Sequence, residues 1–134
     1  MIFQVSAMMN VKAYAPIVVR IGLSLVFLWF GINQIFNRED FLSYLPEFLL
    51  TLSFAETIVL INGIFEVIAG LLLLLGIGIR PVALLLAIHL LGITFSLGYN
   101  DIAIRDFGLV MATIAVFLYG TDRWSIEKKK KKDT

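Results

Sequence analysis

Cysteine is absent from this sequence of 134 residues, and histidine occurs once, as His89. The absence of cysteine excludes disulfides, thiolate catalysis, iron–sulfur ligation and redox exchange through a CxxC motif. A single histidine excludes a histidine-rich metal cage, so we expect no metal site and no intrinsic cofactor. Neither GxGxxG nor GxxxxGK[ST] occurs in the sequence, which excludes the common phosphate-binding loops.

Charged residues are also scarce. They make up 16% of the chain, whereas hydrophobic residues make up 60%, and the mean hydropathy is +0.93. A typical soluble domain is about 25% charged, because a small domain must present polar groups to water. The composition therefore excludes a soluble enzyme, a disordered chain and a nucleic-acid-binding module. It predicts a protein whose main partner is the lipid bilayer.

Four apolar stretches are long enough, or nearly so, to cross a bilayer, which takes about 20 residues per helix. They cover about residues 16–36, 54–75, 81–97 and 102–119. Pro16 and Pro81 suit the first turn of a helix. Ser53 and Glu56 have the spacing of a capping box, and Gly76 suits a helix end. The sequence thus predicts an all-α integral membrane four-helix bundle of antiparallel up-down topology, in a single domain over residues 1–125.

Two segments outside these stretches differ from the predicted helices. Residues 37–53 are apolar but interrupted by Pro46, which favours an interfacial or re-entrant segment packed on the bundle. Residues 126–134 form a lysine-rich tail, which we interpret as disordered. Its lysines are expected to anchor the topology by contacting anionic lipid.

The distribution of Lys and Arg predicts the orientation of the bundle. Four crossings put both termini on one side of the membrane, together with the predicted hairpin at 76–80. That side carries nine basic residues, whereas the other side carries two, Arg38 and Arg105. By the positive-inside rule, both termini lie in the cytoplasm, and the protein is a multi-pass protein of the cytoplasmic membrane.

Each predicted helix carries one stripe of small or polar residues. We expect these stripes to face the other helices, because small residues let helices approach and polar side chains then bond across. The stripes are Arg20, Ser24, Phe27, Gly31 and Gln34; Asn62, Glu66, Gly70 and Leu73; Leu85, His89, Gly92 and Ser96; and Arg105, Leu109, Ala112 and Val116.

The ionisable residues fall at two predicted levels. At about 1.5 Å of rise per residue, Glu66 and His89 lie at the same depth, within reach of the long Arg20 side chain. Arg20, Glu66 and His89, with Asn62 next to them, are therefore predicted to form a buried polar cluster. A second polar cluster is predicted at the outer surface, from Gln34, Tyr99, Asp101, Arg105 and Asp106.

These residues also have purely structural interpretations. Arg20 and Glu66 are interpreted first as an ion pair that fixes helix register, and only second as a proton relay. His89 is interpreted first as a hydrogen-bonded core residue, because it would be alone as a haem ligand. Asp101 and Arg105 are four residues apart, so they are alternatively a pair at a helix start.

Several residues keep a distinctive order and spacing. They are Arg20 with Gly31; Glu66-x3-Gly70-x5-Gly76-x3-Arg80-Pro81; Arg105-Asp106-x-Gly108; and Gly120 before Arg123-Trp124-Ser125. Over about residues 16–127 this pattern resembles the DoxX family of small four-helix membrane proteins, and the loop at 37–53 and the lysine tail depart from it. The resemblance implies a bacterial or archaeal cytoplasmic membrane protein. Some relatives are subunits of quinone-linked oxidoreductases in sulfur metabolism, and others anchor oxidative-stress complexes in the membrane.

Three functions stay open, because the family supplies no agreed catalytic residues and function transfers only by analogy. The first is a membrane subunit of a redox complex, in which Glu66, His89 and Asn62 contact a quinone and a partner protein supplies the electrons. Its expected aromatic walls are Phe27, Phe65 or Phe95. The second is a non-enzymatic membrane anchor or scaffold, and the third is a carrier of a small lipophilic molecule. Catalysis by the chain alone is not expected, and a homo-oligomer is compatible with the sequence.

Overall fold

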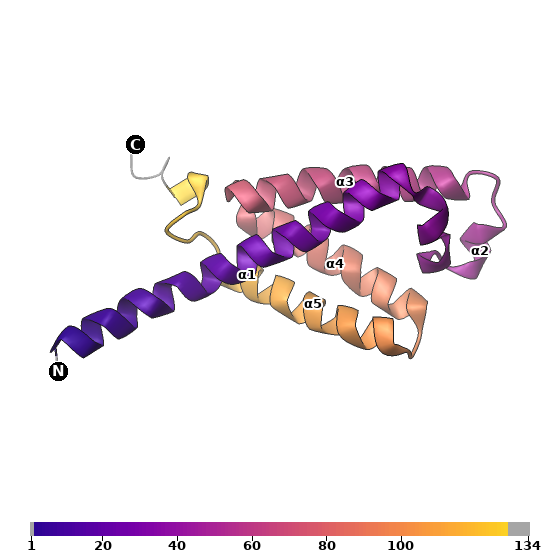
Figure 1. Cartoon of the computed structure of the whole chain (residues 1–134). Coiled ribbons are helices and arrows are strands. Elements are labelled where there is room, and N and C mark those ends of the chain that lie inside the picture. Colours follow the sequence, from indigo (N-terminus) through magenta and orange to yellow (C-terminus); the bar gives the residue numbers. More distant parts are fainter. Residues whose placement is uncertain (1, 129–134) are drawn as a thin grey trace.

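The fold is built from helices over residues 2–128, the part of the chain that the computed structural model describes (Figure 1). Its long helices are α1 (Ile2–Phe36), α3 (Ala55–Leu75), α4 (Ile79–Leu97) and α5 (Asp101–Tyr119). Each of them contains a stretch long and apolar enough to cross a membrane. The start of α1 and the segment after α5 lie at one end of the bundle, which we call the terminal end (Figure 1). The predicted all-α four-helix membrane fold is thereby confirmed.

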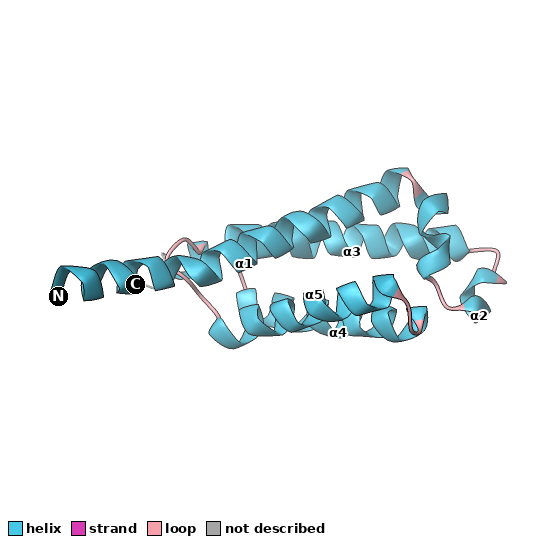
Figure 2. Ribbon diagram, turned by 60° about the horizontal axis from the view of Figure 1, so that its bottom comes forward, coloured by secondary structure: helices cyan, strands magenta, loops and turns pink. Residues whose placement is uncertain are grey.

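The helices pack as two antiparallel hairpins that lie in two layers (Figure 2). α1 packs on α3 in one layer, and α4 packs on α5 in the other. Between the hairpins, α3 ends at Gly76, whose φ of 77° is a left-handed conformation that glycine adopts without steric cost. Buried apolar side chains such as Leu73, Leu86 and Val110 belong to one core shared by the layers.

The outside of the bundle is apolar along its whole length. Large exposed side chains occur on every long helix, for example Val18, Ile61, Ile88 and Leu118. A soluble domain of this size would not expose such a continuous apolar surface, whereas lipid acyl chains cover it at no cost. The helices therefore lie in the bilayer, with their outer faces against lipid.

The first helix starts earlier than the sequence suggested. α1 begins at Ile2 rather than near Pro16, so that Pro16 lies inside the helix. The preceding residues include strong helix formers such as Lys12, Ala13 and Ala15, and the loss of one hydrogen bond at Pro16 does not end the helix. α1 therefore extends beyond the bundle at the terminal end (Figure 1).

The predicted capping box at the start of α3 is wrong. Phe54 occupies the N-cap position, and no side chain accepts a hydrogen bond from the first turn there. The turn residues before α3 close through backbone hydrogen bonds instead, with Ala55 N donating to Leu52 O at 3.2 Å. Ser53 and Glu56 are both exposed, because apolar packing rather than capping sets this helix start.

The stripes predicted to face inward are confirmed for α1 and α3, and in part for α4 and α5. All five stripe residues of α1 are buried, and on α3 the buried residues include Glu66, Gly70 and Leu73. On α4, His89, Gly92 and Ser96 line a cavity between the layers, whereas Leu85 is exposed. On α5, Val116 is buried, whereas Arg105 is exposed. The buried residues are Ile79, Ala83, Leu86, Ala87 and Leu90 on α4, and Ala103, Asp106, Val110, Thr113 and Val116 on α5.

The segment between α1 and α3 closes the end of the bundle opposite the terminal end, which we call the distal end. It folds into a 3₁₀ helix, η1 (Arg38–Tyr44), and one helical turn, α2 (Glu47–Leu50). η1 contacts α1, α3 and α4, so it reaches both layers. The segment is thus packed on the bundle end.

Two glycines let α1 and α3 approach closely. A Cβ added to Gly31 would lie 2.8 Å from the carbonyl oxygen of Gly63 and 2.9 Å from the Val67 nitrogen. A Cβ added to Gly63 would lie 2.8 Å from the carbonyl oxygen of Gly31. Since the opposing atoms are backbone atoms, any side chain here forces the helices apart.

We expect Gly31→Ala and Gly63→Ala each to destabilise the protein by about 1–3 kcal/mol, the usual cost of forcing extra atoms into a packed core. The measurement is the unfolding midpoint in detergent micelles, followed by circular dichroism. Gly22→Ala is the matched control, because a Cβ on Gly22 meets nothing within 4 Å. A Gly63→Ala variant as stable as Gly22→Ala would show that the close approach is unimportant.

Candidate functional site

A cavity of about 390 Å³ lies between the two layers near the distal end. This volume is within the range of small-molecule sites, which are mostly apolar with a few polar groups. The apolar part of its wall comes from α1, η1, the turn after η1, and α3 to α5. The apolar lining residues are Val26, Phe27, Phe30, Phe41, Leu45, Pro46, Ile58, Val59, Leu90, Ile93 and Leu109.

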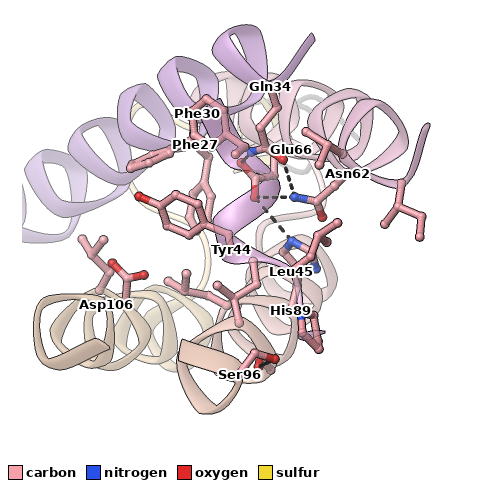
Figure 3. A pocket seen from close by; sticks show the side chains of 18 of the residues that line it. Phe27, Phe30, Gln34, Tyr44, Leu45, Asn62, Glu66, His89, Ser96 and Asp106 are labelled. Atoms are coloured by element: carbon pink, nitrogen blue, oxygen red, sulfur yellow. Dashed lines mark hydrogen bonds and ion pairs between the residues drawn. The ribbon is translucent and has the colours of Figure 1, made fainter. Parts of the chain in front are cut away.

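One wall of the cavity carries a buried network around Glu66 (Figure 3). Gln34 of α1 donates from Nε2 to Glu66 Oε2 at 2.9 Å. Asn62 donates from Nδ2 to Glu66 Oε1 at 3.3 Å and to Gln34 Oε1 at 2.5 Å. Glu66 is only 4% exposed, and both of its oxygens accept from neutral amides. The network therefore fixes the carboxyl group against the cavity.

His89 approaches the same carboxyl group from α4. Its Nε2 lies 3.3 Å from Glu66 Oε1, yet this nitrogen is buried without a hydrogen-bond partner in the described part of the chain. The Phe65 ring packs edge-on against the imidazole, with centroids 5.1 Å apart. A buried polar atom without a partner is rare and costly, so the histidine nitrogen is available to a ligand.

A second carboxyl group, Asp106 of α5, lines the cavity from the other layer (Figure 3). Asp106 is 4% exposed, and its Oδ1 accepts from the Arg105 guanidinium at 3.2 and 3.3 Å. The Arg105 side chain is itself 55% exposed and is absent from the cavity lining. Asp106 is therefore paired on its outer side and faces the cavity on the other.

Aromatic rings attach the distal segment to the cavity wall. Phe30 packs edge-on against Phe41 with centroids 6.1 Å apart, and Phe41 stacks on Tyr44 at 5.6 Å. Figure 3 shows Tyr44 between Asp106 and the Glu66 network. The 3₁₀ helix η1 thus provides an aromatic cover for the space between the two carboxyl groups.

Arg20 lies away from this cavity, and its predicted pairing with Glu66 is wrong. Its guanidinium donates to both carboxylate oxygens of Asp122, from Nε at 2.6 Å and from Nη2 at 3.0 Å. Its Nη1 donates to the carbonyl oxygens of Leu73 and Leu74, at 2.9 and 2.7 Å. Arg20 pairs with Asp122 at a position where the last carbonyls of α3 also accept hydrogen bonds from its Nη1.

The segment after α5 folds back over the terminal end of α3. Asp122 Oδ1 also accepts from the backbone nitrogen of Trp124 at 3.0 Å. The nitrogen of Glu127 donates to the carbonyl oxygen of Gly76 at 3.0 Å, and a Cβ on Gly76 would lie 2.5 Å from Ser125. Arg20, Asp122 and this returning segment form what we call the terminal clasp.

Comparison with known families agrees with this architecture. Residues 15–98 match the model of the DoxX family, which is more than half of the chain. The chain belongs to the DoxX family. No curated protein and no solved structure matches it. The DoxX match contains α3, α4 and the part of α1 inside the bundle, and therefore Arg20, Glu66 and His89.

The outer cluster expected for this DoxX protein does not form as a unit. Gln34 belongs to the Glu66 network, and Asp106 lines the cavity. Tyr99 is 94% exposed and Asp101 is exposed, so they lie on the surface without joining the cavity. Of the five residues, only Arg105 and Asp106 pair, as neighbours in sequence rather than across helices.

Several residues of the DoxX chain have roles that the sequence did not indicate. No role was predicted for Asp122, although the predicted topology puts it at the same end of the bundle as Arg20. Phe41 and Tyr44 line the cavity, yet they belong to the 37–53 segment, for which the sequence predicted only packing on the bundle. The apolar character of that segment was the one feature that indicated a buried role for them. Conversely, Phe95 is 77% exposed and Phe65 packs behind His89, so neither lines the cavity, whereas Phe27 does.

No group of three or more His, Asp or Glu side chains within the described residues has the arrangement of a metal site. The chemistry that the cavity offers is instead hydrogen bonding and proton exchange. Glu66, His89 and Asp106 are its ionisable groups, and Asn62, Gln34, Tyr44 and Ser96 add polar atoms to the lining.

We expect Arg20→Met and Asp122→Asn to destabilise the DoxX chain by about 3–5 kcal/mol each, because each leaves a buried charge without its partner. Unfolding midpoints in detergent provide the measurement. Glu56→Gln, at an exposed carboxyl group, is the control and should change stability by less than about 1 kcal/mol. The double variant Arg20→Met with Asp122→Leu should recover part of the loss. Equal stability of Asp122→Asn and Glu56→Gln would contradict the role of the terminal clasp.

Proposed function

We propose that this DoxX protein is a membrane subunit of a redox complex and that its cavity holds a quinone headgroup. The observation that supports this most directly is the buried, unpartnered Nε2 of His89 beside Glu66, in a cavity with aromatic walls. A quinone offers a flat apolar ring and carbonyl oxygens that accept hydrogen bonds. The ring matches the aromatic walls of the cavity, and the carbonyl oxygens match the Nε2 of His89.

In this proposal, each polar residue has a defined part. His89 donates a hydrogen bond from Nε2 to one quinone carbonyl, and Glu66, 3.3 Å away, exchanges the proton with the imidazole. Gln34 and Asn62 hold the Glu66 carboxyl group in place through their amide donors. Phe27 and Phe30 supply the apolar faces on which the ring packs.

Electrons must come from a partner protein, because the chain has no cysteine to hold an iron–sulfur cluster or form a redox disulfide. A soluble or membrane-bound redox partner would bind outside the cavity and reduce or oxidise the quinone. The cytoplasmic membrane and cytoplasmic termini belong to the same proposal, since Lys12, Arg20, Arg80 and Arg123 lie toward the terminal end of the bundle, whereas Arg38 and Arg105 lie toward the distal end.

A quinone-binding measurement tests the cavity. Purified protein in neutral detergent is titrated with decylubiquinone, and binding is followed by quenching of protein fluorescence. Glu66→Gln and His89→Ala should each weaken binding by about tenfold or more, as expected when a buried hydrogen-bonding partner is lost. Glu56→Gln on α3 and Ile88→Ala on α4 are matched controls, because both side chains are exposed.

Unchanged quinone binding in the Glu66→Gln, His89→Ala double variant would refute the quinone site. If that variant is less stable but binds decylubiquinone as the unchanged protein does, the network serves only to hold the helices together. The chain would then act as an anchor or scaffold.

The orientation is tested separately, because the chain lacks cysteine and single cysteines can be introduced freely. We expect Ser43→Cys, exposed at the distal end, to react with a membrane-impermeant maleimide in intact cells. Ile77→Cys, exposed in the hairpin at the terminal end, should react only after permeabilisation. The reverse labelling would place the termini outside the cytoplasm.

A further inference from the structure

The cavity has an uneven balance of charged groups. Two carboxyl groups line it, Glu66 from one layer and Asp106 from the other. Among the described residues that line it there is no lysine and no arginine, and His89 is the single basic group. The strong cation predicted to neutralise Glu66, Arg20, pairs with Asp122 at the terminal end instead. The cavity therefore favours positive charge.

The partners of the two carboxyl groups place no positive charge inside the cavity. Glu66 accepts hydrogen bonds from the amides of Gln34 and Asn62, which carry no net charge. Asp106 is paired through Oδ1 with Arg105, whose exposed side chain lies outside the lining. In a low-dielectric cavity, an incompletely neutralised carboxylate attracts a cation far more strongly than it does in water.

The walls have the second property needed for a cation with an organic body. The rings of Phe27, Phe30, Phe41 and Tyr44 line the cavity, and three of them form a continuous contact. Aromatic faces attract desolvated cations, and aromatic cages are the usual receptors of quaternary ammonium groups. Figure 3 shows the Tyr44 ring between Asp106 and the Glu66 network. A positive charge bound beside this ring would have one carboxyl group on either side.

We propose that the cavity is also a binding site for lipophilic monocations, such as quaternary ammonium or phosphonium compounds. The charge lies between Glu66 and Asp106, and the apolar body packs on the aromatic and aliphatic walls. The outer faces of the helices contact lipid, so such a ligand is supplied from the membrane. This inference does not depend on the quinone proposal, because it rests on charge, whereas a quinone is neutral.

A pair of ions with the same shape and opposite charge gives the sharpest test. The full chain in neutral maltoside micelles is dialysed to equilibrium against tetraphenylphosphonium or tetraphenylborate, and binding to protein-free micelles is subtracted. We expect the phosphonium to bind at least about tenfold more tightly than the borate, as charge selection at a buried carboxylate requires. This comparison uses unchanged protein and needs no variant.

Variants then locate the site. Glu66→Gln and Asp106→Asn keep the shape of each side chain and remove its charge, and each should weaken phosphonium binding about tenfold. Glu56→Gln and Asp101→Asn are matched controls on the same two helices, since both side chains are exposed, and should change binding less than about twofold. Phe30→Leu should weaken binding about threefold through loss of one aromatic face.

Two results of the dialysis experiments would overturn the inference. One is equal protein-dependent binding of the two ions, and the other is phosphonium binding that survives in both Glu66→Gln and Asp106→Asn. If one variant does not fold, the other variant and the comparison of the two ions on unchanged protein still test the cation site.

Competition with decylubiquinone separates the two proposals. Quinone binding without phosphonium binding refutes only the cation site. Phosphonium binding without quinone binding refutes only the quinone site. Simultaneous, non-competing binding would show that the cation binds elsewhere.

Discussion

The buried guanidinium of Arg20 is the constraint on which the rest of the bundle depends. A charged group that is 1% exposed in an apolar protein is tolerated only if it is paired and hydrogen-bonded, and four of the five N–H groups of this guanidinium donate hydrogen bonds. These bonds join α1, the end of α3 and Asp122 of the segment after α5. One side chain thus ties the first helix to the last part of the described chain, and the terminal end is fixed by it.

The terminal clasp also explains several of the residues whose spacing resembles the family. Gly76 accepts a hydrogen bond at its carbonyl oxygen from Glu127 and leaves room for Ser125, while its positive φ ends α3. Gly120 lies against Arg80, since a Cβ there would be 2.8 Å from Nε. These residues therefore close one end of the bundle. Other residues of the same pattern act elsewhere: Gly31 lets α1 approach α3, and Glu66 and Asp106 line the cavity.

Sequence reasoning identified the helices well, because long apolar runs and their breaks at Gly76 and Gly98 leave little choice of secondary structure. It was less successful with side-chain partners. The depth of Arg20 was compatible with Glu66, yet helix rise alone does not fix the rotation of a helix about its axis. Leu85 and Arg105, for example, are exposed although their stripes were predicted to face inward. Asp122 and Tyr44 were missed because both lie in segments whose path depends on tertiary packing.

The pairing of Arg20 with Asp122 has a direct consequence for the cavity. Had Arg20 reached Glu66, the carboxyl group of Glu66 would be held in a structural ion pair with a full positive charge. Because Arg20 pairs with Asp122, Glu66 is held by two amides instead, and it is approached by an imidazole nitrogen that has no hydrogen bond to the described residues. The ion pair at the terminal end supplies rigidity there, and the carboxyl group of Glu66 remains part of the cavity wall.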